Sequence, residues 1–109
     1  MNFEELQGLV LDWANDKDLI HVENADKQFL KFVEEIFEFK TEMDLYSLSK
    51  QGFDFDHVMM EMGDIFVTLI ILCKQLDLDP IDCLEKAYEK ISKRKGKTID
   101  GVFVKEEDL

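Results

Sequence analysis

The chain has 109 residues, of which 46% are hydrophobic and 35% are charged, a profile that indicates one folded domain and excludes a disordered chain. Its net charge of −12 argues against a nucleic-acid partner, which requires clustered Lys and Arg, and against binding to an anionic membrane surface. Because one proline and five glycines leave few breaks, we predict an all-α fold of long helices.

Four helices are predicted from apolar residues that recur at helical spacing. A polar loop over residues 16–24 separates the first helix from the second, and a turn around Gly52 separates the second from the third. The predicted helical ranges are 3–15, 25–48, 55–76 and, for the fourth helix, from Asp79–Pro80 to near Gly96.

The fourth helix has a clear start signal in Asp79 and Pro80. Aspartate is a favoured N-cap, and proline lacks only an N–H that would have no partner at the first helical position. Beyond this helix, residues 98–109 show no helical period, so we predict an extended tail with a turn at Asp100–Gly101. The folded domain is therefore placed at residues 1–97.

The remaining general features favour a cytoplasmic protein. Cys73 and Cys83 lack metal-ligand spacing and are predicted to be reduced thiols. The N-terminal segment is amphipathic and acidic, unlike a secretory signal or a transit peptide. The longest apolar run, residues 65–73 with Thr68 inside it, is too short to span a bilayer.

The second helix carries three crowded glutamates, Glu34, Glu35 and Glu38. At about 100° per residue, they share with Lys31 the side opposite the apolar face of this helix. Considered without the rest of the chain, this pattern indicates an ordinary solvated face.

The third helix is apolar around nearly its whole circumference, and such a helix is expected to be buried. The exception is one narrow polar stripe, which holds His57, Glu61, Asp64, Thr68 and Gln75. Buried carboxylates are costly unless they are paired or bind a metal. Glu61 and Asp64 therefore need a partner.

An antiparallel hairpin of the second and third helices would supply that partner. Its midpoint near residues 49–50 places Glu35 and Glu38 opposite Glu61 and Asp64. Four carboxylates cannot share one site as bare anions, and a hard cation such as Mg²⁺, with Mn²⁺ as an alternative, resolves the repulsion. The absence of a neighbouring histidine ligand argues against zinc, and that of Glu-x-x-His against a di-iron centre.

The segment "EEIFE", followed 22 residues later by "EMGD", resembles the Glu-Glu-x-x-Glu…Glu-x-x-Asp motif of the MazG-like nucleoside triphosphate pyrophosphohydrolases. The similarity extends to "LDWA", to "QFLKFVEEIFEF" and to the basic fourth helix with its tail. The resemblance implies a MazG-like four-helix bundle and Mg²⁺-dependent hydrolysis of a (d)NTP to (d)NMP and pyrophosphate. Because a single hairpin cannot cover a third helix that is apolar on nearly all sides, we also predict that dimerisation completes the bundle, as a homodimer or a dimer of dimers.

Within this resemblance, the metal ligands would be Glu35, Glu38, Glu61 and Asp64. Glu34 would hold a further metal ion or orient the attacking water. Phe37 departs from the family pattern, in which many members carry a small residue between the glutamates, and this puts the local packing in doubt.

Substrate contacts are also implied. Lys90 and Arg94, in a basic segment at the end of the fourth helix, would contact the polyphosphate. Lys31 would either touch phosphate or pair with Glu35, and His57 would either contact phosphate or serve as a capping or supporting residue.

Trp13 and Gln28 are candidates for a nucleobase pocket, through stacking and an amide contact. Trp13 lies on an apolar stripe, so the alternative is a place in the core.

Two other functions remain open at this point. Phosphoribosyl-ATP pyrophosphohydrolase has a related helical fold and acidic motif, although the basic fourth helix and "TIDGVFV" fit it less well. The other is a non-catalytic acidic helical module with solvated carboxylates.

Overall fold

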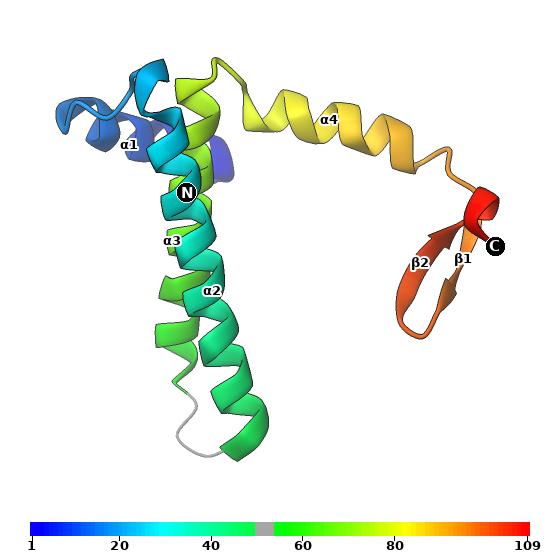
Figure 1. Cartoon of the computed structure of the whole chain (residues 1–109). Helices are drawn as coiled ribbons and strands as arrows, with labels where there is room; N and C mark the ends of the chain where they lie inside the picture. Colours follow the sequence, from blue (N-terminus) through cyan, green and yellow to red (C-terminus); the bar gives the residue numbers. More distant parts are fainter. Residues whose placement is uncertain (50–53) are drawn as a thin grey trace. The chain divides into compact units, whose positions relative to one another are not determined.

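The computed structural model of the chain describes residues 1–49 and 54–109 (Figure 1). The predicted turn around Gly52 lies outside these residues. In chain order the elements are α1 (Phe3–Asp16), the 3₁₀ turn η1 (Val22–Asn24), α2 (Ala25–Ser49), α3 (Phe55–Gln75), α4 (Pro80–Ile91), β1 (Gly96–Ile99), β2 (Val102–Lys105) and the 3₁₀ turn η2 (Glu106–Asp108). The described chain is thus mostly helical, as predicted, with one small two-stranded sheet.

The chain divides into two compact units, Met1–Leu78 and Asp79–Leu109, which are described separately. These units are defined by contacts within the chain and do not test the boundary of the folded domain. The boundary proposed at residue 97 stays a prediction. Among the described residues, no helix combines the length and apolarity needed to cross a membrane. Cys73 and Cys83 form no disulfide.

Three helices begin at a side chain that caps their first turn. Asn2 accepts a hydrogen bond from the Glu5 backbone N–H at 2.8 Å. Asp54 accepts one from His57 at 3.1 Å, and Asp79 accepts one from Ile81 at 2.8 Å. These bonds satisfy backbone donors that no helical carbonyl reaches, which is why the short polar residues mark the helix starts.

In the first unit, α2 and α3 form the predicted antiparallel hairpin, and α1 packs against α3 (Figure 1). The interior of this unit is unusually polar. Its buried apolar residues are Ala14, Ile70 and Ile71, and its buried polar residues are Glu35, Thr68 and Gln75. Part of each polar stripe therefore lies inside the hairpin, whereas Glu34, Glu38 and Asp64 are exposed.

Two side-chain amides hold this polar interior together. The Gln28 amide donates to the Thr68 carbonyl oxygen at 3.1 Å and so joins α2 to α3. The Gln75 amide donates to the Leu19 carbonyl oxygen at 2.8 Å and joins α3 to the loop after α1. The Leu19 carbonyl also accepts from the His21 backbone N–H at 3.0 Å, so the Gln75 amide is its second donor.

The apolar faces of α2 and α3 point outward. Large side chains with half or more of their surface exposed include Phe29, Leu30, Phe37, Met59 and Met60. α3 is therefore left partly uncovered within this chain, as the sequence predicts for a helix that a single hairpin cannot cover. The physical reason is that one hairpin has a single inner face, and the acidic and amide side chains occupy it.

In the second unit, α4 ends at Ile91, so the predicted end near Gly96 is wrong by about one turn. Gly96 instead begins β1 and pairs with Lys105 of β2. A Cβ at this glycine would overlap the Val104 carbonyl oxygen, so the strands approach closely because residue 96 has no side chain.

The two strands of this hairpin are antiparallel and meet at Asp100–Gly101, where the sequence predicts a turn. Asp100 and Gly101 have φ angles of 51° and 80°, as a two-residue hairpin turn with left-handed residues requires.

Candidate metal centre

The α2–α3 hairpin brings together three of the four predicted metal ligands. Glu35 and Glu38 lie one turn apart on α2, and Glu61 lies opposite them on α3. One carboxylate oxygen from each of the three residues lies within 4.8 Å of the others. This is the spacing of atoms that share one cation or repel one another without it.

Glu35 is the most buried member, with 8% of its surface exposed. Its Oε1 atom lies 3.4 Å from Nζ of Lys31, whereas its Oε2 atom is buried and has no hydrogen-bond donor as a partner among the described residues. An unpartnered buried carboxylate oxygen is costly. A divalent cation held by oxygen ligands would relieve this cost, so these residues fit such an ion.

The crowding changes the acidity of Glu38. The Glu35 carboxylate raises the pKa of Glu38, because a proton on Glu38 would form a hydrogen bond to Glu35 and relieve their repulsion. Burial, Glu34 and Glu61 raise the pKa of Glu38 further. A divalent cation at this group would therefore compete with a proton for the same carboxylates.

Lys31 offsets part of this negative charge. Its Nζ atom lies 3.7 Å from the exposed Glu34 carboxylate, in addition to its contact with Glu35. Glu34, followed by Glu35, raises the pKa of Lys31. Lys31 is thus paired with the acidic residues, which is one of the two roles expected for it.

Asp64, the fourth predicted ligand, is exposed on α3. Among the described residues it does not belong to the group formed by Glu35, Glu38 and Glu61. Its assignment as a ligand stays a prediction based on the resemblance.

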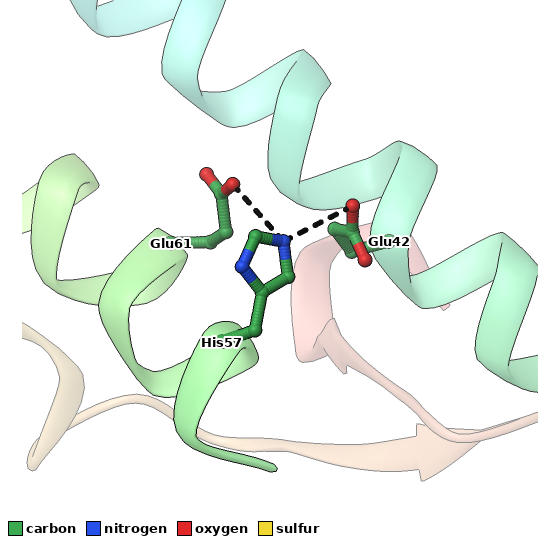
Figure 2. Close-up of side chains that lie close together, drawn as sticks. All are labelled: Glu42, His57 and Glu61. Atoms are coloured by element: carbon green, nitrogen blue, oxygen red, sulfur yellow. Dashed lines mark ion pairs between the residues drawn. The ribbon is translucent and has the colours of Figure 1, made fainter. Parts of the chain in front are cut away.

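His57 lies beside the acidic group and contacts a residue that the sequence reasoning missed. Its Nε2 atom is 3.4 Å from Oε1 of Glu61 and 3.4 Å from Oε1 of Glu42 (Figure 2). A usable signal was present, because Glu42 and His57 have the same sum of residue numbers as Glu38 and Glu61. In an antiparallel hairpin, residues whose numbers have the same sum lie opposite each other. Glu42 therefore faces His57 one helical turn along the hairpin from Glu38 and Glu61.

The candidate base-pocket residues lie elsewhere in the first unit. Trp13 is half-exposed and is not a core residue. It lines an apolar groove of about 370 Å³ with Leu6, Leu9, Val10 and Val67. Gln28 is engaged with the Thr68 carbonyl.

Lys90 and Arg94 belong to the second unit, at the end of α4 and in the segment that follows it. Their expected contact with phosphate stays a prediction.

Comparison of this chain with protein-family models, with curated proteins and with solved structures finds no significant match.

Proposed function

We propose that this chain is a cytoplasmic, Mg²⁺-dependent nucleoside triphosphate pyrophosphohydrolase of the MazG-like kind. It cleaves a (d)NTP between the α- and β-phosphates and releases (d)NMP and pyrophosphate. The observation that carries this proposal is the convergence of Glu35, Glu38 and Glu61 across the hairpin. The motif that contains these glutamates resembles that of the MazG-like pyrophosphohydrolases, and this resemblance indicates the reaction.

In this proposal, Glu35, Glu38 and Glu61 hold the cation, and Asp64 completes the set. When bound, Mg²⁺ supplies positive charge that neutralises the phosphates and makes a nearby water a better nucleophile. Glu34 is exposed at the edge of the group and accepts the proton of the attacking water.

The substrate is held by the cationic and aromatic residues. Lys90 and Arg94 bind the polyphosphate, which needs positive charge from the protein in an otherwise acidic chain. Trp13 stacks on the base at the rim of the apolar groove, where its ring is accessible.

The enzyme acts as a homodimer or a dimer of dimers, in which helices of two chains complete a four-helix bundle. The outward apolar faces of α2 and α3 support this assembly. Burial of apolar surface contributes about 25 cal/mol per Å², so a second copy is the natural cover for such faces. Light scattering should give at least twice the chain mass, and a monomeric mass at micromolar concentration would contradict the assembly.

The function is tested by measuring pyrophosphate release from a panel of (d)NTPs with and without Mg²⁺. We expect release that requires the metal and is largely lost in Glu38→Gln. The matched control is Asp44→Asn, which removes an exposed α2 carboxylate that pairs only with Lys40 among the described residues.

Release that is absent for every nucleotide, or unchanged in Glu38→Gln, would refute the proposal. Phosphoribosyl-ATP is included in the panel, because preferential cleavage of it would favour the related enzyme instead.

A further inference from the structure

A second group of ligand atoms lies one level along the hairpin from the Mg²⁺ candidate. It consists of Glu42 on α2 with His57 and Glu61 on α3, and both carboxylates approach the same ring nitrogen (Figure 2). Each of the two oxygens is 3.4 Å from His57 Nε2. The Glu42 and Glu61 side chains are 31% and 18% exposed, so they are partly shielded from water.

These distances do not describe an ordinary hydrogen-bonded ion pair. A histidine N–H bonds oxygen at about 2.7–3.2 Å, so both contacts exceed the usual length, and the two oxygens share one ring nitrogen. The separations are instead equal and longer than hydrogen bonds.

The other histidine of the chain provides the contrast. His21 has the same side-chain exposure as His57, 43%, and also lies near two carboxylates. Its Nε2 atom is 2.6 Å from Asp18, while Glu23 lies 4.0 Å from the opposite ring nitrogen. The hydrogen bond to Asp18 raises the pKa of His21. His21 is thus a hydrogen-bonded ion pair and offers no shared ligand position.

The two nitrogen–oxygen separations of 3.4 Å match edges of a tetrahedron around a small cation, and the two oxygens lie within 4.8 Å of each other. Bonds of about 2.0–2.1 Å to nitrogen and oxygen give tetrahedral edges of about 3.3–3.5 Å. The octahedral shell of Mg²⁺, with similar bond lengths, has edges of about 2.9 Å. The His57 group therefore differs from the neighbouring all-oxygen group in its chemistry, because one of its three ligand atoms is a nitrogen.

We propose that Glu42, His57 and Glu61 form a binding site for a zinc-like transition-metal ion, with a fourth position open to water. One imidazole and two carboxylates suit Zn²⁺ or Co²⁺ better than Mg²⁺. Two carboxylates facing one imidazole leave the group negatively charged. Glu61 also belongs to the group formed with Glu35 and Glu38. Its carboxylate thus lies between two proposed cation positions, one with oxygen ligands only and one that includes a nitrogen ligand.

This site does not depend on the hydrolysis reaction, because its test uses no nucleotide. The full-length chain is titrated with Zn²⁺ by calorimetry in the presence of millimolar Mg²⁺, which fills the all-oxygen group. Co²⁺ serves as a spectroscopic probe, since its visible bands report tetrahedral coordination with nitrogen. We expect Zn²⁺ binding that persists in Mg²⁺ and intense Co²⁺ bands.

The discriminating variants lie on the two helices of the hairpin. His57→Gln and Glu42→Gln should each weaken Zn²⁺ binding by at least about tenfold and remove the intense Co²⁺ bands. His21→Gln is the matched control and should change neither. Because Glu42→Gln keeps the side-chain shape and removes a charge, helical circular dichroism should stay native in at least that variant.

Zn²⁺ affinity that is unchanged in both His57→Gln and Glu42→Gln would overturn the proposal. So would Zn²⁺ binding that Mg²⁺ displaces in full, because this result would assign zinc to the group of Glu35 and Glu38. Failure of either kind leaves pyrophosphate release untouched, so this site and the proposed function are refuted by different measurements.

Discussion

Without metal, the Glu35→Gln variant is expected to be more stable than the wild type. With Mg²⁺ added, the wild type is expected to be the more stable of the two. Glutamine keeps the shape of the side chain, removes the charge and can donate a hydrogen bond to a neighbouring carboxylate. An unsatisfied buried polar atom costs about 1–3 kcal/mol. Glu35 Oε2 is such an atom.

The substitution also has a cost, because Lys31 loses its ion pair at 3.4 Å. Lys31 is 52% exposed, so this pair contributes only about 0.2–1 kcal/mol. The expected net gain in the free energy of unfolding is therefore about 1–2 kcal/mol without metal. For a domain of this size, each kcal/mol raises Tm by about 4–8 °C.

Mg²⁺ should make the wild type more stable than the Glu35→Gln variant. A ligand that binds only the folded state stabilises it by about 2.7 kcal/mol at a concentration one hundred times its Kd. The Glu35→Gln variant lacks one of the proposed metal-coordinating carboxylates, so Mg²⁺ should stabilise it less than it stabilises the wild type. Thermal melts at one fixed protein concentration, with EDTA or with millimolar Mg²⁺, measure both arms.

The control for this comparison is Asp44→Asn. Asp44 pairs with Lys40 at 2.9 Å in the same i, i+4 arrangement on α2, but its side chain is 57% exposed. Its loss should change stability by less than about 1 kcal/mol, with or without metal. If Glu35→Gln is less stable than wild type in EDTA, Glu35 stabilises the fold as an ion-pair partner of Lys31, and its buried Oε2 atom does not destabilise the metal-free chain.

Three further outcomes follow from single contacts. In metal-free protein, Glu38→Gln should be stabilising at neutral pH, and this gain in the free energy of unfolding should vanish below the ordinary carboxyl pKa of 4.5. The raised pKa of Glu38 means that the folded state binds the proton more tightly, so wild-type stability falls as pH rises from that value. A gain that is independent of pH in urea titrations would contradict this prediction. Gln75→Ala should destabilise by about 0.5–1.5 kcal/mol in urea unfolding, because the 2.8 Å bond that joins α3 to the loop after α1 is lost while the Leu19 carbonyl keeps the His21 N–H, and an unchanged midpoint would refute that role. Gly96→Ala should expose the β1–β2 amides to hydrogen exchange while helical circular dichroism stays constant, because the new Cβ meets the Val104 carbonyl, and protection equal to wild type would contradict the close approach.

The sequence predicted most helix boundaries well, because strong local signals mark them. Asp79 followed by Pro80 gave the start of α4, and apolar periodicity gave α2 to within one residue. The end of α4 was missed because a glycine after a helix usually marks its C-terminus. Here Gly96 serves strand pairing with Lys105, a nonlocal requirement that periodicity does not reveal.

The candidate site was predicted in part for a similar reason. The constant-sum rule for a helical hairpin brought Glu35 and Glu38 to Glu61, and the structure places them together. The same rule would have found Glu42 opposite His57, but Glu42 lies outside the family motif and was not considered. The helical wheel could not tell which face of α3 turns inward, because that depends on which neighbour covers each side.

The most direct test of the central claim is product analysis after incubation of a (d)NTP with the chain and Mg²⁺. Chromatography of the products separates cleavage at the α–β bond from cleavage at the β–γ bond. We predict (d)NMP and pyrophosphate in equal amounts, with no product in Glu61→Gln. Release of (d)NDP and phosphate, or no Mg²⁺-dependent product from any nucleotide, would contradict the claim.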